Sequence, residues 1–308
     1  MFSSFVYLQN HISRIIPALL ISAAFGCGNQ MNSDIDISAK HFKVRTPFIL
    51  NGRGIILNTY WGSEKKHHVL CLDNYSPSWI KDSLIQYDQS FIKSGNPGFK
   101  TFTADGSSIQ GDVGICDSLS FANIVFIKVP FYVMPNNPKD NKNDDGVIGI
   151  DVMSKAIWKI DFKNYELTFA SSIDSFREIS QAEVFPATFN EQSITVEVDF
   201  GNNNIKTMAI DLGYNGYMLM PLTEFNKISS TNKIFTNPGT FATPASENNV
   251  NNLSISDTVN IDHNWFFTIV SSNETAKERL IGLDFFKRFD YVLFDFINKQ
   301  IYIPKKVW

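Results

Sequence analysis

The chain has 308 residues, of which 44% are hydrophobic and 14% aromatic, and its formal net charge is -4 at pH 7. This composition excludes an intrinsically disordered chain, and the length suits two lobes that share a sizeable core. The negative charge and the lack of a basic stripe argue against a nucleic-acid partner.

The first 26 residues resemble an export signal. His11 and Arg14 precede an apolar run over 15–25 that is too short to span a bilayer. The run ends in Ala24-Phe25-Gly26-Cys27, which resembles a bacterial lipobox, although leucine is usual where Ala24 stands. We expect cleavage before Cys27, lipidation of Cys27, and a tether over 27–45. This predicts an exported lipoprotein, either outer-membrane or periplasmic, whose lipid anchors it to the membrane; plain secretion and an uncleaved anchor are the alternatives.

Beyond Cys27, the body of the mature chain contains two cysteines, Cys71 and Cys116. They are too few for a disulfide framework. One bridge between them is conceivable in an oxidising compartment, but the sequence favours two buried, unpaired thiols.

A predicted β-hairpin in each half of the chain ends in an aspartate. In the first half, strands over 55–61 and 67–72 flank a Gly-Ser-Glu-Lys-Lys turn and lead to Asp73. In the second half, residues 194–200 alternate strictly, and the turn 201–204 precedes a strand that leads to Asp211. Gly213 follows two places later and would let another group approach the backbone closely.

Longer repeats support a duplication. Residues 147–169 align with 280–303 once a single residue is inserted, and Asp117 to Phe121 align more faintly with Asp257 to Ile261. The same blocks therefore recur in the same order in both halves. We predict an all-β fold of two similar β-barrel-like lobes over 46–172 and 184–308, with a cleft between them and a polar boundary over 171–183.

These blocks resemble the two-lobed aspartic peptidases of the pepsin/retropepsin type across nearly all of the mature chain. In that family each lobe contributes an Asp-Thr/Ser-Gly loop, and an apolar-apolar-Gly segment packs behind it. Residues 147–149 and 280–282 match the second element, and 294–299 resemble the last hairpin of the family. The run 105–111, followed by 117–119, is similar to the flap that closes over bound peptide.

The resemblance implies that Asp73 and Asp211 form a carboxyl dyad that hydrolyses peptide bonds with a water molecule held between them. Two carboxyls about 3 Å apart share one proton and titrate as a unit, which suits general acid/base catalysis without a covalent intermediate. An extended peptide would pair with the flap by backbone hydrogen bonds. Implied substrate-binding residues are Ser76, Tyr75, Gly213, Asp105, Gly106 and Ser107.

The catalytic motifs depart from the family pattern. The first reads Asp73-Asn74-Tyr75, so a phenol ring stands where glycine is usual, and the second reads Asp211-Leu212-Gly213. The family uses the missing hydroxyls to hold the two loops together; Leu212 cannot do so, and Asn74 supplies half of this function. The tyrosine usual in the flap is Thr103.

Other acidic and metal-ligand patterns favour structural interpretations. Recurring aspartates at predicted helix starts and hairpin turns suit capping: Asp151, Asp161, Asp284 and Asp295. Residues 141–146 superficially resemble a calcium loop, but Val152 stands where the bidentate glutamate belongs. The adjacent pair His67-His68 lacks a suitably spaced third ligand, so we expect no metal and no cofactor.

The sequence thus predicts a monomeric aspartic-type endopeptidase that acts on peptides or unfolded proteins. The alternative is a catalytically impaired module on the same scaffold that binds peptide or protein without cutting it. A purely structural surface lipoprotein is the third possibility.

Overall fold

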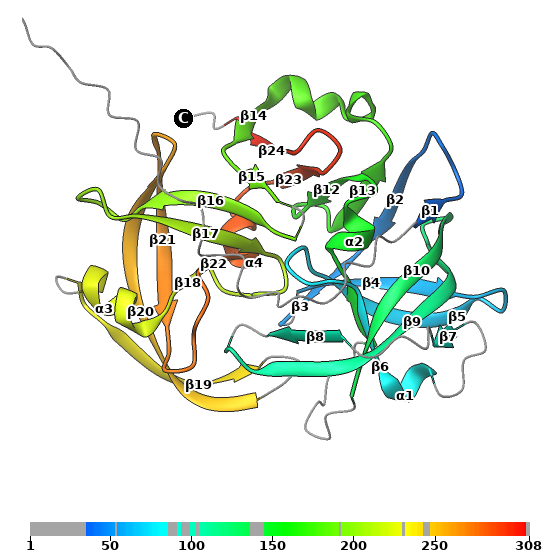
Figure 1. Cartoon of the computed structure of the whole chain (residues 1–308). Helices are drawn as coiled ribbons and strands as arrows, with labels where there is room; N and C mark the ends of the chain where they lie inside the picture. The colour runs from blue at the N-terminus through cyan, green and yellow to red at the C-terminus, as the bar shows by residue number, and fades with distance from the viewer. Residues whose placement is uncertain are drawn as a thin grey trace, which may run out of the picture.

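Figure 1 shows the computed structural model of the chain, which describes residues 35–52, 54–85, 91–93, 99–102, 105–135, 145–190, 192–229, 232–242 and 247–305. Three β-sheets make up most of the regular structure in these ranges, which confirms the predicted all-β fold. The predicted signal sequence, Cys27 and Thr103 lie outside the described residues.

The first lobe is a ten-stranded sheet built from the N-terminal half, drawn in blue to green in Figure 1. Its strands are β1 (Asp36–Ile37), β3 (Ile49–Asn51), β4 (Gly54–Trp61), β5 (Lys66–Leu72), β6 (Trp79–Lys81), β7 (Phe91–Lys93), β8 (Phe99–Phe102), β9 (Ser108–Phe121), β10 (Ile124–Met134) and β11 (Gly146–Ile148).

The second lobe is an eight-stranded sheet from the C-terminal half, drawn in yellow-green to orange. Its strands are β15 (Thr188–Phe189), β16 (Ile194–Asp199), β17 (Ile205–Asp211), β18 (Met218–Leu219), β19 (Phe235–Ala242), β20 (Glu247–Ile261), β21 (Asn264–Ser272) and β22 (Leu280–Gly282).

A six-stranded sheet joins the two halves, because β12 of the first half pairs antiparallel with β23 of the second. Its strands are β2 (Lys43–Pro47), β12 (Ile157–Asp161), β13 (Glu166–Ala170), β14 (Ala182–Phe185), β23 (Tyr291–Asp295) and β24 (Gln300–Pro304). The helices are short: α1 (Asp82–Ile85), α2 (Ile150–Met153), α3 (Leu222–Ile228), α4 (Leu283–Phe286) and the 3₁₀ turns η1 (Ile173–Ser175) and η2 (Arg177–Gln181).

The predicted internal repeat corresponds to a repeated unit of structure. Strand β11 leads through α2 to the β12–β13 hairpin, and β22 leads through α4 to the β23–β24 hairpin. The fainter repeat is also structural, because β9–β10 and β20–β21 are both long hairpins. Each turns through two residues with positive φ, Ala122-Asn123 and Asp262-His263, the geometry of a tight hairpin turn.

The chain joins the fold earlier than the predicted tether allows. Residues 36–37 pair with β10, and Lys43–Pro47 pairs with β13, although we expected a tether as far as residue 45. The reason is apolar side chains within that segment. Ile35 is buried in the main core, and the ring of Phe42 packs edge-on against Phe169 at 5.8 Å.

One hydrophobic core runs through both lobes. Its aromatic side chains form a first-lobe group around Trp158 and Phe169 and a second-lobe group around Phe266 and Phe285. Cys71 and Cys116 are buried thiols that are not joined in a disulfide, as the sequence favoured. The core thus holds the two hairpins that deliver the aspartates against a common support.

Candidate active site

The structure presents Asp73 and Asp211 in the same way, each at the end of the second arm of a hairpin. Strand β5 ends at Leu72, next to Asp73, and pairs in parallel with β11. Strand β17 ends at Asp211 and pairs in parallel with β22. Each acid therefore leaves the sheet beside an apolar-apolar-Gly segment, as predicted.

The two carboxyl groups meet at the junction of the lobes. The side chains of Asp73 and Asp211 are hydrogen-bonded to each other. A Cβ atom added to Gly213 would lie 2.5 Å from Asp73 Oδ2 and 3.1 Å from Asp211 Oδ1, so both acids lie over the backbone of this glycine. Any side chain here would collide with the pair, which explains why a glycine is needed.

Backbone amides hold each carboxyl from below. The Tyr75 amide donates to Asp73 Oδ1 at 2.8 Å. In the second loop the Gly213 and Tyr214 amides donate to Asp211 Oδ1 at 2.8 and 3.1 Å. These bonds fix the orientation of both acids and leave their other oxygens for each other and for a ligand.

The surroundings raise the pKa of both acids. Burial raises the pKa of Asp73, and burial together with the charge of Asp73 raises the pKa of Asp211 well above its usual range. Asp211 is only 9% exposed, whereas Asp73 is partly exposed. A proton is therefore held between the two carboxyls well above the pH at which isolated aspartates lose theirs.

Asn74 joins the two loops across the lobe junction. Its Nδ2 donates to the Ile210 carbonyl at 2.9 Å, and its Oδ1 accepts from the Leu212 amide at 2.9 Å. The side chain is fully buried. One amide therefore supplies both a donor and an acceptor to the opposite loop, from one side only, as the sequence analysis anticipated for Asn74.

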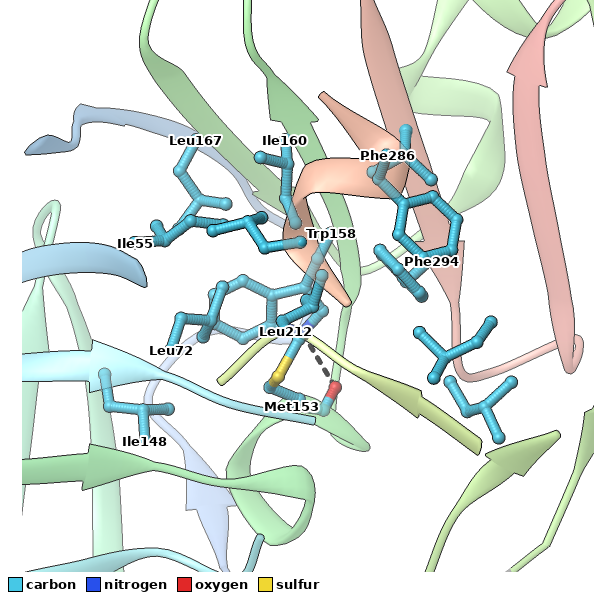
Figure 2. Close-up of a cluster of buried hydrophobic side chains, with 14 of the residues drawn as sticks. Ile55, Leu72, Ile148, Met153, Trp158, Ile160, Leu167, Leu212, Phe286 and Phe294 are labelled. Carbon is cyan, nitrogen blue, oxygen red and sulfur yellow. Dashed lines mark hydrogen bonds between the residues drawn. The ribbon is translucent and has the colours of Figure 1, made fainter. Parts of the chain in front are cut away.

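Leu212 contributes to packing instead of hydrogen bonding. Figure 2 shows its side chain among the buried residues of the main core, which also includes Leu72 and Trp158. In the same picture the Trp158 indole nitrogen donates to the Met153 carbonyl at 2.7 Å. An apolar residue suits this buried position, so the second loop loses its hydroxyl at no cost in unsatisfied polar groups.

The Tyr75 ring crosses from the first lobe to the second. It packs against a small apolar cluster that includes Ala209, Ala276 and Leu280, and its hydroxyl is hydrogen-bonded to Glu278. Burial and the nearby charge of Glu278 raise the pKa of Tyr75, so its hydroxyl stays protonated and donates this bond. Burial likewise raises the pKa of Glu278.

Ser76 lies beside the site, but its hydroxyl is directed elsewhere. The hydroxyl donates to the Pro77 carbonyl at 2.9 Å, and only the Ser76 backbone amide reaches Asp73. Sequence analysis overlooked the nearby Ser78. Its hydroxyl donates to Asp151 Oδ1 at 2.6 Å and accepts from the Gly149 amide at 2.9 Å, which fastens the first loop to the segment behind it.

The predicted flap is a hairpin of β8 and β9 that extends toward the second lobe (Figure 1). In its turn, Asp105 accepts hydrogen bonds from both the amide and the hydroxyl of Ser107, each at 3.0 Å. Gly106 has φ +81° and lies against Lys277 of the second lobe, whose Cγ would be 3.4 Å from an added Cβ. The flap tip therefore lies close to the second lobe.

The remaining recurring aspartates have structural partners. Asp161 and Asp295 each accept from the backbone amide and the side chain of an asparagine three residues later, Asn164 and Asn298, which closes the two equivalent turns. Asp284 pairs with Lys287 at 2.5 Å. Asp151 bonds Ser78 and does not cap its own helix, since Gly149 is the N-cap.

Sequence analysis did not identify Glu278 or Lys277. Both precede the apolar-apolar-Gly block of the second half, and the only available signal was their position two and three residues before Leu280. Nothing in the sequence indicates which residue of the other lobe they face.

No group of three or more His, Cys, Asp or Glu side chains within the described ranges is placed to hold a metal ion. The four residues 141–144 of the calcium-like loop lie outside these ranges. None of the described helices is long and apolar enough to cross a membrane.

A hydrogen-bonded pair of carboxyls with raised pKa values can both donate and accept protons. The ionised member can take a proton from a water molecule while the protonated member polarises a carbonyl oxygen. Both acids are fixed by backbone amides, so little reorganisation is needed for such a step.

Comparison with known proteins gives a fold. No protein-family model and no curated protein sequence matches the chain. Among solved structures, an aspartic proteinase from Irpex lacteus is similar at 14% identity and TM-score 0.59, over 86% of this chain and 98% of that one. The basic 7S globulin from soybean (10% identity, TM-score 0.55) and conglutin gamma, a basic 7S globulin from lupine seeds (11%, 0.55), are similar over 86% of this chain and 95% of theirs. The chain therefore has the bilobal pepsin-like fold, which a proteinase and seed globulins share.

Proposed function

We propose that the protein is an aspartic-type peptidase that hydrolyses peptide bonds in peptides or unfolded proteins. The observation that carries this proposal is the contact between Asp73 and Asp211, which are hydrogen-bonded to each other and raised in pKa. The sequence led us to expect an endopeptidase, which is a narrower claim than the peptidase proposed here.

The reaction would use the two carboxyls with a water molecule. The ionised carboxyl removes a proton from the water as its oxygen attacks the scissile carbonyl, and the protonated carboxyl gives its proton to the carbonyl oxygen. Collapse of the tetrahedral intermediate breaks the carbon–nitrogen bond: the amine leaves with a proton from the pair, and a hydroxyl of the intermediate returns a proton to the pair as the product carboxyl group forms. The flap hairpin would supply backbone groups to an extended substrate.

A second function, peptide or protein binding without cleavage, is favoured by one observation. Tyr75 occupies the place that corresponds to Gly213, and its ring lies beside the carboxyl pair. Seed globulins and a proteinase share this fold, so the fold alone does not establish an activity.

The two functions differ in their response to Asp73→Asn and Asp211→Asn. Cleavage of unfolded protein would be followed between about pH 3 and 7, the range in which a shared-proton pair acts. A peptidase should lose all turnover in either variant, whereas a binding module should keep its ligand with at most a modest loss. Absence of cleavage at every pH, together with no binding of a pepstatin-like transition-state mimic, would refute the peptidase proposal.

We further propose that the protein is exported and anchored through a lipid on Cys27. The motivation is the lipobox-like sequence. Incorporation of labelled palmitate into the wild-type chain but not into Cys27→Ala would support this proposal, and equal labelling would contradict it.

A further inference from the structure

Two contacts cross from the first lobe to the second at consecutive residues. Beside the carboxyl pair, the Tyr75 hydroxyl bonds Glu278. At the flap tip, Gly106 lies against the side chain of Lys277. The segment 277–278 is therefore bonded by the loop that carries Asp73 and lies next to the turn of the hairpin expected to cover a substrate.

The Tyr75 contact is a packed one. Its ring rests on the second-lobe cluster of Ala209, Leu219, Ala276 and Leu280, so it is held by apolar contact as well as by the bond to Glu278. Tyrosine loses little conformational entropy when it is fixed in this way, because it has only two side-chain torsions.

The second loop has no ring at the equivalent position, although the next residue, Tyr214, packs against the same second-lobe cluster from within its own lobe. The corresponding residue is Gly213, above whose backbone the two carboxyls lie. The two sides of the carboxyl pair, equivalent in a symmetric duplication, thus differ: one side has a bare glycine and the other has a ring that reaches across to the opposite lobe.

We propose that Tyr75 and Glu278, with the flap tip on Lys277, close the space between the lobes on one side of the carboxyl pair, so that a substrate chain can continue in one direction only. This inference rests on the proposed function and narrows it. The substrate class is a peptide whose chain end lies within a few residues of the scissile bond, and Tyr75 is a specificity-determining residue.

Glu278 positions the ring in this arrangement. The guanidinium of the next residue, Arg279, forms two bonds to Glu224 at 2.6 and 2.7 Å. The hydrogen bonds of Arg279 are directed to Glu224, and the Tyr75 hydroxyl donates a hydrogen bond to the partly buried Glu278 carboxyl. This bond fixes the hydroxyl end of the Tyr75 ring.

The test compares one unfolded peptide of about 12 residues as a linear chain and as a backbone-cyclised ring, with products identified by mass spectrometry. The full-length wild-type protein should cut the linear peptide near one end and cut the ring at least tenfold more slowly. Linear peptides blocked at the amino end or at the carboxyl end then identify which chain end must lie near the scissile bond. Wild-type cleavage in the middle of the linear peptide, or equal cleavage of the ring, overturns the inference and leaves the peptidase proposal intact.

Variants separate the ring from its anchor. Tyr75→Gly introduces the residue found in the second loop. It should raise the cleavage rate of the cyclic peptide relative to that of the linear peptide at least tenfold, and Tyr75→Phe and Glu278→Gln should raise this ratio less. The matched control is Tyr165→Gly in the β12–β13 turn, where φ is +54° and glycine fits; its ratio should be unchanged. A ratio that Tyr75→Gly and Tyr75→Phe both leave unchanged overturns the inference.

Binding gives a second readout that needs no turnover. Pepstatin-like mimics extended on one side, on the other, or on both are titrated against the wild-type protein. One of the two singly extended mimics should bind at least tenfold more weakly than the other, and the doubly extended mimic should bind as weakly as the weaker one. Tyr75→Gly should remove this difference in affinity. Equal binding of all three overturns the inference, and absence of both binding and cleavage overturns the peptidase proposal with it.

Discussion

Replacing Asn74 with alanine should separate the two loops that hold the carboxyl pair. The fully buried side chain makes two 2.9 Å hydrogen bonds to the opposite loop, to the Ile210 carbonyl and from the Leu212 amide. Alanine would leave both backbone groups buried without partners, at about 1–3 kcal/mol each. We therefore expect the free energy of unfolding to fall by roughly 2–6 kcal/mol, with loss of peptide cleavage because the two acids are no longer held together.

The matched control is Asn215→Ala. Asn215 also bonds across the lobes, from its Nδ2 to the Gly52 carbonyl at 2.7 Å, but this bond is exposed to solvent. Water can replace it, so the loss should be about 0.5 kcal/mol or less. Urea unfolding at fixed pH measures both variants. A loss for Asn74→Ala no larger than that for Asn215→Ala would refute the claim that the buried bonds of Asn74 hold the two loops together.

Three further substitutions test the site. Gly213→Ala places a Cβ 2.5 Å from Asp73 Oδ2 and should abolish cleavage, whereas Gly52→Ala, with nothing within 4 Å, should cleave normally; activity in both would contradict the packing of the acids. Asp151 is partly buried and desolvation raises its pKa, so its neutral form stabilises the fold at low pH and this contribution is lost as pH rises through the folded-state pKa. Asp151→Asn should remove that part of the decline in unfolding free energy above about pH 4, and identical pH curves would refute it. Leu212→Thr buries a hydroxyl in an apolar core and should cost about 1–3 kcal/mol in thermal or urea unfolding, and a gain in stability would show that the core accepts a polar group there.

The features predicted best from the sequence were those that follow from the local alternation of apolar residues and from internal repeats. The alternation in 194–200 and the repeat of 147–169 in 280–303 were enough to place Asp73 and Asp211 at the ends of equivalent hairpins. The strands at 36–37 and 43–47 were missed because each is short and takes its stability from a distant strand, β10 or β13. No local pattern encodes such a pairing.

Contacts between the lobes were hardest to predict. The bond between Tyr75 and Glu278 joins residues about 200 positions apart and depends on how the halves pack. The phenol of Tyr75 was visible in the sequence as a departure from the usual glycine, but the direction in which the ring turns was not. For Ser76, the resemblance suggested a hydroxyl near Asp73, whereas a nearer acceptor, the Pro77 carbonyl, takes that bond.

The two loops differ at each motif position except the acid. One amide at Asn74 can satisfy both a carbonyl and an amide of the opposite loop, so the second loop needs no polar residue there and Leu212 is free to join the core. The third position has likewise diverged, to Tyr75 in one loop and Gly213 in the other. Hydrogen bonds between the loops can come from one loop alone, as Asn74 shows, and so can a ring that crosses between the lobes, as Tyr75 shows. A shared proton, in contrast, requires a carboxyl group from each loop. Loops that served only to join the lobes would have no need for two buried acids in contact, which destabilise one another when both are ionised. The presence of both acids, against that cost, is the physical argument that the pair serves proton transfer.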